Sequence, residues 1–334
     1  MPYEGPGFPP AGPFVACTDG YGVDNLTVKP LAPSGQQVQI SAFGQHLVAV
    51  EVGGGIREYG TDAGPVLDGY GPEEMCSGGR GQLLAPWPNR LADGSFQWDG
   101  RQLQTAITEV EAHNAIHGLV RWSPWTVRSS GADRAELGFT LHPQPGWPWT
   151  LDIAVSYQLG PRGLTVRTEV TNCSTEPCPA GFGWHPYLYA FGGPVDDALL
   201  RLPAATAYRS DQRGLPDGRF DVTGTDLDFR AARPVGPARL DVCFTDLERG
   251  GDGRAVAELS RPDGSRSARL WVDGAYSHLM VFSGDTLAEP ARRRRGLAVE
   301  PMTGAPNFLR TGDGLRTLQP GASLHGTWGV EVFS

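Results

Sequence analysis

The sequence of 334 residues predicts an all-β fold, a large antiparallel β-sandwich. Turn-forming residues are frequent, with 46 glycines and 29 prolines spread along the chain. Short segments with apolar residues at every second position follow one another, which is the period of a strand with one buried face. No segment keeps an apolar period of 3.6 residues over three helical turns. Many strands joined by many turns account for all these observations.

The first strands are predicted directly after the N-terminal region. Residues 38–43 alternate with period two, and 47–52 form a second strand that ends in the glycines 53–55. Asp99-Gly100 separates two short strand-like stretches and therefore predicts a hairpin. Further strands are predicted at 95–98, 125–128, 135–141, 150–159, 164–172, 269–272, 278–282 and 297–300.

The domain organisation predicted from the sequence is simple. Residues 1–34 are expected to be an irregular extension, because their prolines and glycines leave little room for regular structure. Beyond them, neither a break in composition nor a repeat of fixed period divides the chain. Residues 35–334 are therefore predicted to form a single β-sandwich domain, since all-β folds of this size occur as one unit.

Charge excludes several classes of function. The formal net charge is −9 and the pI is about 5.3, so a nucleic-acid partner is not expected. The one basic run, 292–295, is either a solvated turn before a strand or a phosphate site. Lysine and arginine together number 28, and only Lys29 is a lysine. Chemistry through a Schiff base, which needs a buried lysine, is therefore not expected.

Cysteine usage and apolar patterning predict a cytoplasmic protein. The five cysteines are an odd number and form no C-x-x-C motif, which argues against a disulfide framework or a structural zinc site. Residues 1–13 have neither the basic nor the apolar region of a signal peptide. No stretch approaches the roughly 20 apolar residues of a membrane helix, so no membrane partner is expected.

The first of four polar motifs is Pro86-Trp87-Pro88-Asn89-Arg90. The two prolines exclude a helix and stiffen the backbone. Arg90 offers a planar fork of donors to ligand oxygens, and Asn89 adds a polar side chain. The alternative is that Arg90 pairs with a neighbouring carboxylate.

The second motif contains His113 and His117. Histidines four residues apart on a helix suit a metal ion, but Gly118 and the segment 122–125 favour a loop or strand. No third cluster of ligand residues is evident, so a metal site is not expected. His117 is a candidate for binding a substrate, and a hydrogen-bonded structural histidine is the alternative.

The third motif places His185 between glycines and Pro186. A rigidly held imidazole among aromatic rings is suited to proton transfer near neutral pH. The flanking Trp184 and Tyr187 offer rings on which the C–H face of a sugar stacks. The alternative is a buried histidine bonded to a carbonyl group.

Two acidic residues complete the candidate site. Asp241 lies in an apolar, strand-like stretch and needs a partner there, either the backbone or a hydroxyl group of a ligand. Glu300 is predicted to end a strand directly before Pro301. Its apolar surroundings predict a raised pKa and a role as general base, whereas a solvated acid at a strand end is the alternative.

Taken together, the chain resembles the aldose 1-epimerase (galactose mutarotase) family from about residue 36 to 332. The resemblance rests, in chain order, on Asn89-Arg90, Gly94, Trp98-Asp99-Gly100, Asn114 to Gly118, Gly183 to Tyr187, Leu240-Asp241, Cys243-Phe244, Glu300 to Thr303, Gly312 to Leu315 and Leu318 to Gly321. It implies a galactose mutarotase-like sandwich and the interconversion of α and β anomers of a free aldohexose of the glucose or galactose type.

The resemblance also implies residue roles. Glu300 corresponds to the general base and His185 to the general acid, while His117, Arg90 and Asp241 correspond to residues that bind the sugar. The hypothesis is that the two groups open and reclose the sugar ring by acid–base catalysis. Neither a metal nor an organic cofactor is expected, because the reaction has no redox step and no carbanion. The expected partner is a small sugar, and the expected assembly is a monomer or homodimer.

Three other functions remain open at this stage. The first is a non-catalytic carbohydrate-binding protein on the same fold. The second is a glycoside hydrolase or lyase that uses Glu300 and Asp241 as paired carboxylates. The third is a mutarotase for a sugar phosphate, in which Arg80, Arg90 or Arg121 binds the phosphate.

Overall fold

The computed structural model describes residues 31–333, and residues from Ala32 onwards form one compact unit. The irregular extension predicted for residues 1–34 therefore lies, up to residue 30, outside the described residues. The described part is built almost entirely of strands, and every ladder between them is antiparallel. The all-β prediction is confirmed.

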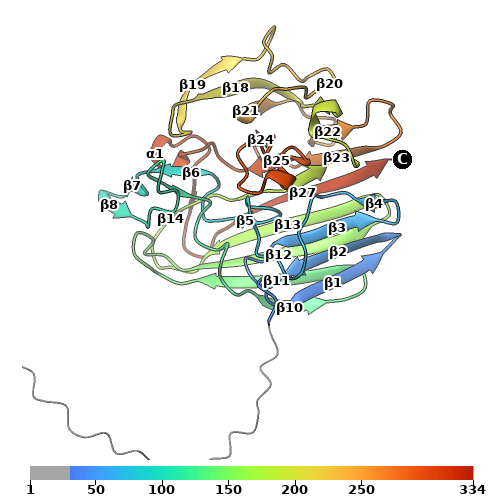
Figure 1. Cartoon of the computed structure of the whole chain (residues 1–334). Helices are drawn as coiled ribbons and strands as arrows, with labels where there is room; N and C mark the ends of the chain where they lie inside the picture. The colour runs from blue at the N-terminus through green and yellow to red at the C-terminus, as the bar shows by residue number, and fades with distance from the viewer. Residues whose placement is uncertain (1–30, 334) are drawn as a thin grey trace, which may run out of the picture. The chain divides into compact units, whose positions relative to one another are not determined.

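One layer is a nine-stranded sheet. Its longest hairpin has buried and partly exposed residues in strict alternation, as expected for strands with one face in the core. The C-terminal strand lies between the second strand of this hairpin and the strands of the other half (Figure 1). In spatial order the strands are β10 (Thr126–Ser130), β11 (Arg134–Leu141), β12 (Leu151–Gly160), β13 (Gly163–Asn172), β27 (Ser323–Phe333), β23 (Ser267–Val272), β22 (Ala255–Ser260), β17 (Leu199–Arg201) and β20 (Arg233–Pro234).

The other large layer is an eight-stranded sheet. Its strand β25 is buried at every position, which explains its nearly continuous apolar sequence. The strands are, in order, β19 (Pro216–Asp221), β18 (Ala204–Ser210), β21 (Asp241–Leu247), β24 (His278–Phe282), β25 (Gly296–Met302), β15 (Gly183–Trp184) and β5 (Leu83–Leu84), with β16 (Tyr187–Tyr189) also paired to β25.

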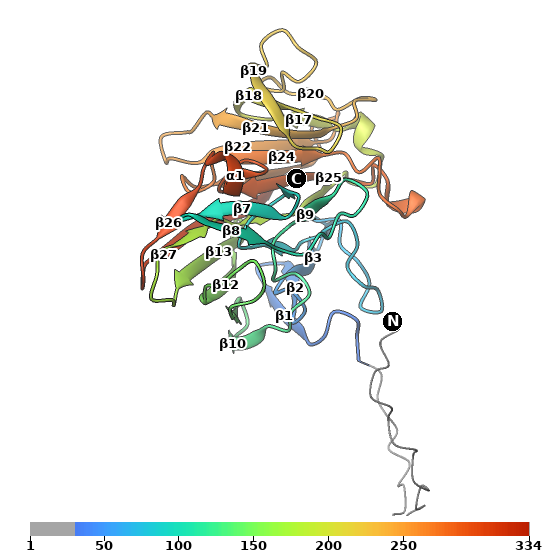
Figure 2. The ribbon, with the colours of Figure 1, turned by 90° about the vertical axis from the view of Figure 1, so that its left-hand side faces the viewer.

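Smaller sheets and short helices complete the described fold. The one α-helix in residues 31–333 is a single turn that lies beside β7 (Figure 2). A four-stranded sheet consists of β1 (Gln37–Ala42), β2 (Gln45–Val50), β3 (Ile56–Thr61) and β4 (Gly64–Pro65). The remaining elements are β6 (Arg90–Ala92), β7 (Ser95–Trp98), β8 (Arg101–Gln104), β9 (Asn114–Ile116), β14 (Cys178–Ala180), β26 (Arg316–Leu318), α1 (Phe308–Thr311) and the 3-10 turns η1 (Val195–Asp197) and η2 (Pro290–Arg292).

Aromatic side chains fill the core between the two large sheets. Trp184 on β15 meets Trp328 on β27, with ring centroids 5.7 Å apart. Its ring also packs edge-on against Tyr157 of β12 at 6.2 Å. All three side chains are fully buried. Two sheets joined by such a core form the predicted sandwich.

The strands predicted from period two are confirmed, with small shifts at their ends. Asp99-Gly100 forms the hairpin turn between β7 and β8, in which Trp98 pairs with Arg101. The prediction that Pro301 ends a strand is wrong, because β25 continues to Met302. No helix within residues 31–333 is long and apolar enough to cross a membrane.

Candidate active site

A break in one strand brings His185 and Glu300 together. Val299 and Thr303 both donate backbone N–H groups to the chain that carries β15 and β16. Pro301 lies midway between them, so its backbone nitrogen faces the same neighbouring segment. As a proline it has no N–H group to donate there. The partner strand is interrupted there, between β15 and β16, and His185 occupies the interruption. The proline therefore costs no ladder bond, and Glu300 stays inside the strand opposite the histidine.

The two side chains are in direct contact at the base of a cavity. His185 Nε2 lies 3.3 Å from Glu300 Oε1, and the two residues are 5% and 2% exposed. His185 Nδ1 and Glu300 Oε2 are buried without a hydrogen-bond partner. In a protein interior such atoms are uncommon and mark places where a ligand or water completes the bonding.

Burial shifts the pKa values of this pair in opposite directions. Burial, reinforced by the charge of Arg121, lowers the pKa of His185 to about 3. Burial, reinforced by the negative charge of Asp241, raises the pKa of Glu300 well above its usual range. The raised pKa predicted for Glu300 is thus confirmed. These opposite shifts favour a proton on the carboxyl group over a proton on the imidazole.

The imidazole of His185 is held on one face and at one edge. One face stacks on Tyr187, with ring centroids 5.0 Å apart and an angle of 13° between the planes. Tyr187 donates its hydroxyl to the Gly78 carbonyl at 2.7 Å and lies under the guanidinium of Arg80 at 4.8 Å. Gly79 lies near the ring edge, where an added Cβ would come within 2.6 Å of His185 Cδ2. The ring therefore has little freedom to rotate.

His117 and Asn89 hold each other in place. The N–H of His117 donates to the Asn89 carbonyl at 2.9 Å, and the N–H of Asn89 donates to His117 Nδ1 at 3.2 Å. His117 has a φ of 65° and Asn89 a φ of 55°. Residues other than glycine seldom adopt such positive values. Because Nδ1 accepts a hydrogen bond, the neutral ring of His117 carries its proton on Nε2 and acts as a donor there.

Arg90 is held by two acidic residues. Its Nε lies 3.0 and 3.1 Å from the two oxygens of Glu109, and its Nη1 lies 3.6 Å from Asp241 Oδ2. Pairing with a carboxylate, the alternative drawn from the sequence, is therefore present. Asp241 is the first residue of β21 and its side chain is 50% exposed, so the apolar surroundings expected for it are not found.

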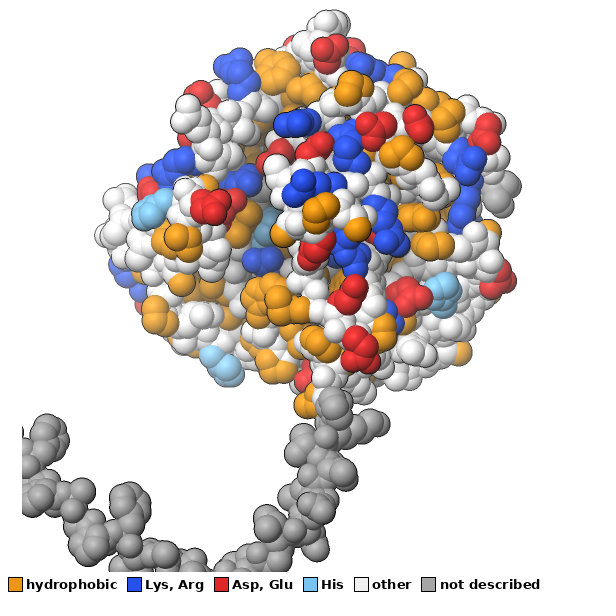
Figure 3. All heavy atoms as spheres, viewed as in Figure 1, with side chains coloured by type: hydrophobic (Ala, Val, Ile, Leu, Met, Phe, Trp, Pro, Cys, Tyr) orange, Lys and Arg blue, Asp and Glu red, His pale blue; other side chains and the backbone are white. Residues whose placement is uncertain are grey.

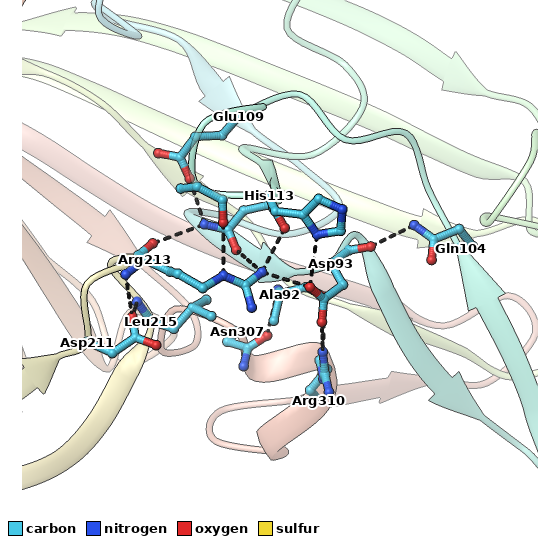
Figure 4. A network of polar contacts seen from close by, with 12 residues as sticks. Ala92, Asp93, Gln104, Glu109, His113, Asp211, Arg213, Leu215, Asn307 and Arg310 are labelled. Atoms are coloured by element: carbon cyan, nitrogen blue, oxygen red, sulfur yellow. Dashed lines mark hydrogen bonds and ion pairs between the residues drawn. The ribbon is translucent and has the colours of Figure 1, made fainter.

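A network of polar contacts supports the wall that carries Arg90 (Figure 4). Arg213 binds Asp93 at 2.8 Å and the carbonyl groups of Ala112 and His113 at 2.9 and 2.7 Å. Asp93 also lies 3.0 Å from His113 and accepts a bond from Arg310 at 3.0 Å. These contacts join the segments around residues 93, 113, 213 and 310. His113 belongs to this network and not to the cavity.

The cavity has a volume of about 260 Å³. The face drawn in Figure 3 is hollowed, and histidine and basic side chains are visible inside the hollow. The residues that line the cavity are Gly78, Gly79, Asn89, Arg90, Ile116, His117, Arg121, His185, Asp241, Phe282, Thr286, Leu287 and Glu300. The structure thus brings together, from five separate parts of the chain, the residues Asn89, Arg90, His117, His185, Asp241 and Glu300.

Two of the predicted binding residues do not line the cavity. Trp184 is fully buried between the sheets, and its Nε1 donates to Thr168 at 2.9 Å. Tyr187 lies beneath His185 and is 1% exposed. The expectation that their rings stack on a sugar does not fit these positions. Arg121 does line the cavity, and nothing in its local sequence distinguishes it from Arg80, which is buried against Asp68 at 3.1 Å.

The basic run 292–295 lies outside this cavity. It comprises the end of η2 and the turn that leads into β25, as predicted. Arg292 pairs with Glu74, Arg294 with Asp196, and Arg295 with Asp68. A larger cavity of about 490 Å³ includes Arg292 and Arg295. It also contains a histidine and a glutamate in contact, His46 and Glu58 at 3.2 Å, but their side chains are 43% and 44% exposed, whereas the pair in the smaller cavity is buried. Within residues 31–333, no three histidine, cysteine or acidic side chains are grouped to hold a metal ion.

Comparison with known proteins identifies the family. The sequence model of the aldose 1-epimerase family matches residues 34–330. The chain belongs to the aldose 1-epimerase family, and this membership implies a sugar substrate.

Individual proteins similar to this chain include curated relatives and solved structures, and the solved structures share its fold. The uncharacterised Escherichia coli K12 protein YihR is 33% identical over 86% of this chain and 90% of its own length. Human galactose mutarotase is 27% identical over 46% of each chain. A solved aldose epimerase homologue from C. elegans superimposes with a TM-score of 0.79 at 15% identity, over 89% of this chain and 98% of that one. An Escherichia coli K12 structure described as a putative aldose 1-epimerase gives 0.77 at 21% identity, over 89% and 99%.

Proposed function

We propose that the protein is an aldose 1-epimerase that interconverts the α and β anomers of a free aldohexose by opening and reclosing its ring. The observation that carries the proposal is the contact between His185 and Glu300 at the base of the cavity, 3.3 Å apart. Each of them also has a buried polar atom without a partner. An acid and a base in contact, both facing a small polar cavity, suit proton transfer at two neighbouring oxygens of one sugar.

In the proposed reaction the pair keeps one proton at the start and the end. Burial favours the proton on Glu300, so in the proposed first step that proton moves across the contact to His185. Glu300 then takes the proton of the anomeric hydroxyl, and His185 gives its proton to the ring oxygen. The C1–O5 bond breaks and the aldehyde forms. Glu300 is then protonated and His185 neutral, which is the distribution that burial favours. After rotation about C1–C2, His185 takes the proton of the C5 hydroxyl and Glu300 returns one to the carbonyl oxygen.

The remaining cavity residues are proposed to hold the sugar. His117 donates through Nε2, and Arg90 and Asn89 offer further donors to the hydroxyl groups. Asp241 accepts from a hydroxyl group in this proposal, and its contact with Arg90 favours its ionised form against the effect of burial. Trp184 and Tyr187 act indirectly in this proposal, by supporting the backbone and the ring of His185.

The proposal is tested by polarimetry of freshly dissolved α-D-glucose and α-D-galactose. Wild type is expected to speed the decay of optical rotation, and Glu300→Gln and His185→Asn are each expected to lower kcat/KM by about 10²- to 10⁴-fold. Glu289→Gln and His142→Asn change the same residue types at exposed positions and should retain the wild-type rate.

Other outcomes point to the other functions. Saturable binding of a sugar without faster mutarotation by wild type would favour a carbohydrate-binding protein. Release of reducing sugar from a glycoside, lost in both Glu300→Gln and Asp241→Asn, would favour a hydrolase. Activity confined to hexose phosphates would assign the substrate to that class.

A further inference from the structure

Arg121 differs from the other arginine that lines the candidate active site. Arg90 is paired with Glu109 at 3.0 Å and with Asp241 at 3.6 Å. Arg121 donates only to neutral acceptors, to Gln82 Oε1 at 3.3 Å and to the Ile116 carbonyl at 3.4 Å. No carboxylate oxygen in residues 31–333 lies within 4.0 Å of its guanidinium nitrogens. Its positive charge is therefore not matched by a protein group in the described chain.

Two neighbouring segments contact the backbone of Arg121. Gln82 Nε2 donates to its carbonyl at 3.3 Å, and Gly53 packs so closely that an added Cβ would come within 2.4 Å of the same oxygen. The guanidinium lies 5.6 Å from the ring of Trp122. A guanidinium has five N–H donors, and two long hydrogen bonds to neutral groups leave most of this capacity unused.

This unmatched positive charge destabilises the protonated forms of the neighbouring histidines. Arg121 lowers the pKa of both His117 and His185, after burial itself, because it repels their protonated forms. Burial also lowers the pKa of Arg121. A cation placed beside two histidines in a polar cavity is stabilised when a ligand brings the missing negative charge.

We propose that Arg121 binds a singly charged oxyanion on the sugar, so that the preferred substrate is an acidic aldose. The inference rests on the proposed function and specifies its substrate class. One unmatched guanidinium balances one negative charge. A doubly charged phosphate would leave excess negative charge near Glu300 and Asp241, because Arg90 is already shared between two carboxylates. Carboxylate and sulfate or sulfonate groups both carry the single charge and fit the planar fork of arginine.

The test compares sugars that differ in charge at one position. Anomer exchange above the spontaneous rate is measured by NMR for D-glucose, D-glucuronate, glucose 6-sulfate and glucose 6-phosphate, and for D-galactose and D-galacturonate. We expect wild type to have a kcat/KM about 10- to 100-fold higher for at least one singly charged sugar than for its neutral counterpart. The carboxylate and sulfate arms identify which oxyanion is preferred.

Variants of Arg121 assign the preference. Arg121→Gln is expected to lower the ratio of acidic to neutral kcat/KM to about one. Arg121→Lys keeps the positive charge but loses the planar guanidinium, and it is expected to give an intermediate ratio of acidic to neutral kcat/KM. It takes the place of Arg121→Gln if that variant does not fold. Arg201→Gln, at an exposed position of β17, should keep the wild-type ratio.

Two results would overturn the inference while leaving the proposed function intact. The first is a wild type that acts on neutral hexoses as well as or better than on every singly charged sugar. The second is an Arg121→Gln variant that slows acidic and neutral sugars equally, which would mean that Arg121 acts only through the two histidines. If wild type speeds anomer exchange of no sugar, the proposed function fails. Binding of D-glucuronate and glucose 6-sulfate, measured by calorimetric titration, then tests the inference about Arg121. Binding that is lost in Arg121→Gln supports it, and no binding overturns it.

Discussion

At the scale of single residues, the proton shared by His185 and Glu300 governs the proposed chemistry. Activity needs one proton on the pair, so kcat should fall at low pH, where a second proton is added, and at high pH, where the shared proton is lost. The high-pH limit depends on Glu300, which is faced by His185, Arg90, Asp241 and the hydroxyl of Tyr187.

Asp241→Asn is predicted to move this high-pH limit to lower pH. The negative charge of Asp241 raises the pKa of Glu300 and also partly neutralises Arg90, which lowers it. Removing the charge of Asp241 ends its direct repulsion of ionised Glu300 and leaves Arg90 more strongly positive. Both effects lower the pKa of Glu300, so Glu300 loses its proton more easily. The kcat–pH profile by polarimetry tests this, with the exposed Asp252→Asn as control. A high-pH limit that stays in place or rises would show that Glu300 is not the group that carries the shared proton.

Residue types in their local motifs were enough to predict the proposed acid and base and several of the polar side chains that line the cavity. Glu300 stands in an apolar run, and His185 stands between glycines and a proline, so each is recognisable without neighbours. The role of Arg121 is not recognisable in this way. Whether an arginine is paired depends on residues that approach in space, and only the fold shows that Arg80 has Asp68 as partner whereas Arg121 has neutral acceptors. The rings of Trp184 and Tyr187 were misjudged for the same reason.

At the scale of elements, the loop of Gly78 and Gly79 positions the imidazole of His185. Gly79→Ala is predicted to lower kcat by displacing that ring, because the added Cβ would come within 2.6 Å of Cδ2. The φ of +72° at this position adds a backbone cost of about 1–2 kcal/mol for alanine.

A matched control separates the two effects of this substitution. Gly253 has a similar φ of +77°, but an added Cβ there meets no atom within 4 Å. Gly253→Ala should therefore lower the free energy of unfolding by a similar backbone contribution and leave kcat unchanged. Chemical denaturation and polarimetry on both variants give the comparison. Equal kcat values for the two variants would contradict a positioning role for Gly79.

Strand elements differed in how well their sequences predict them. In β13 the buried positions alternate without interruption, and the apolar Leu164, Val166 and Val170 occupy three of them, so its sequence predicts a strand. The longest strand, β27, was not predicted, because Gly326 and Gly329 occupy positions of its pattern. The structure gives the reason for Gly329: an added Cβ would come within 2.3 Å of the Leu164 carbonyl and 2.6 Å of Trp271. Close approach of neighbouring strands selects glycine there and removes the strand signal.

At the scale of the whole molecule, the contacts of Ser34 suggest how far the chain can be shortened from its N-terminus. Ser34 is buried, and its carbonyl accepts a hydrogen bond from Val52. Its hydroxyl also accepts a bond from Gln37 at 2.9 Å. A chain that starts at Ala32 after the initiating methionine is therefore predicted to keep the Tm and kcat of the full chain. A chain that starts at Gln36 loses these contacts and should have a lower Tm in calorimetry. Loss of activity on starting at Ala32 would refute the single-domain proposal.

Stability in acid is a second property of the whole molecule, and it follows from buried histidines. His278 is 2% exposed, and burial lowers its pKa to about 4, against about 6.5 in an unfolded chain. The groups that face it are Tyr208, Ser277 and Asp313. Between these two pKa values the unfolded chain binds a proton that the folded chain does not. The free energy of unfolding therefore falls as pH drops from about 6.5 to 4, by up to about 1.4 kcal/mol per pH unit for this residue.

His278→Gln is predicted to make this dependence shallower, whatever its effect on stability at pH 7. Glu300 contributes with the opposite sign, because its raised pKa means that the folded chain retains a proton that the unfolded chain loses above about pH 4.5. That contribution is common to wild type and variant and cancels in their difference. Urea unfolding at pH 7, 6, 5 and 4 measures the slopes, and the exposed His142→Gln should keep that of wild type. Parallel slopes for wild type and His278→Gln would mean that His278 binds its proton equally well in the folded and unfolded chains.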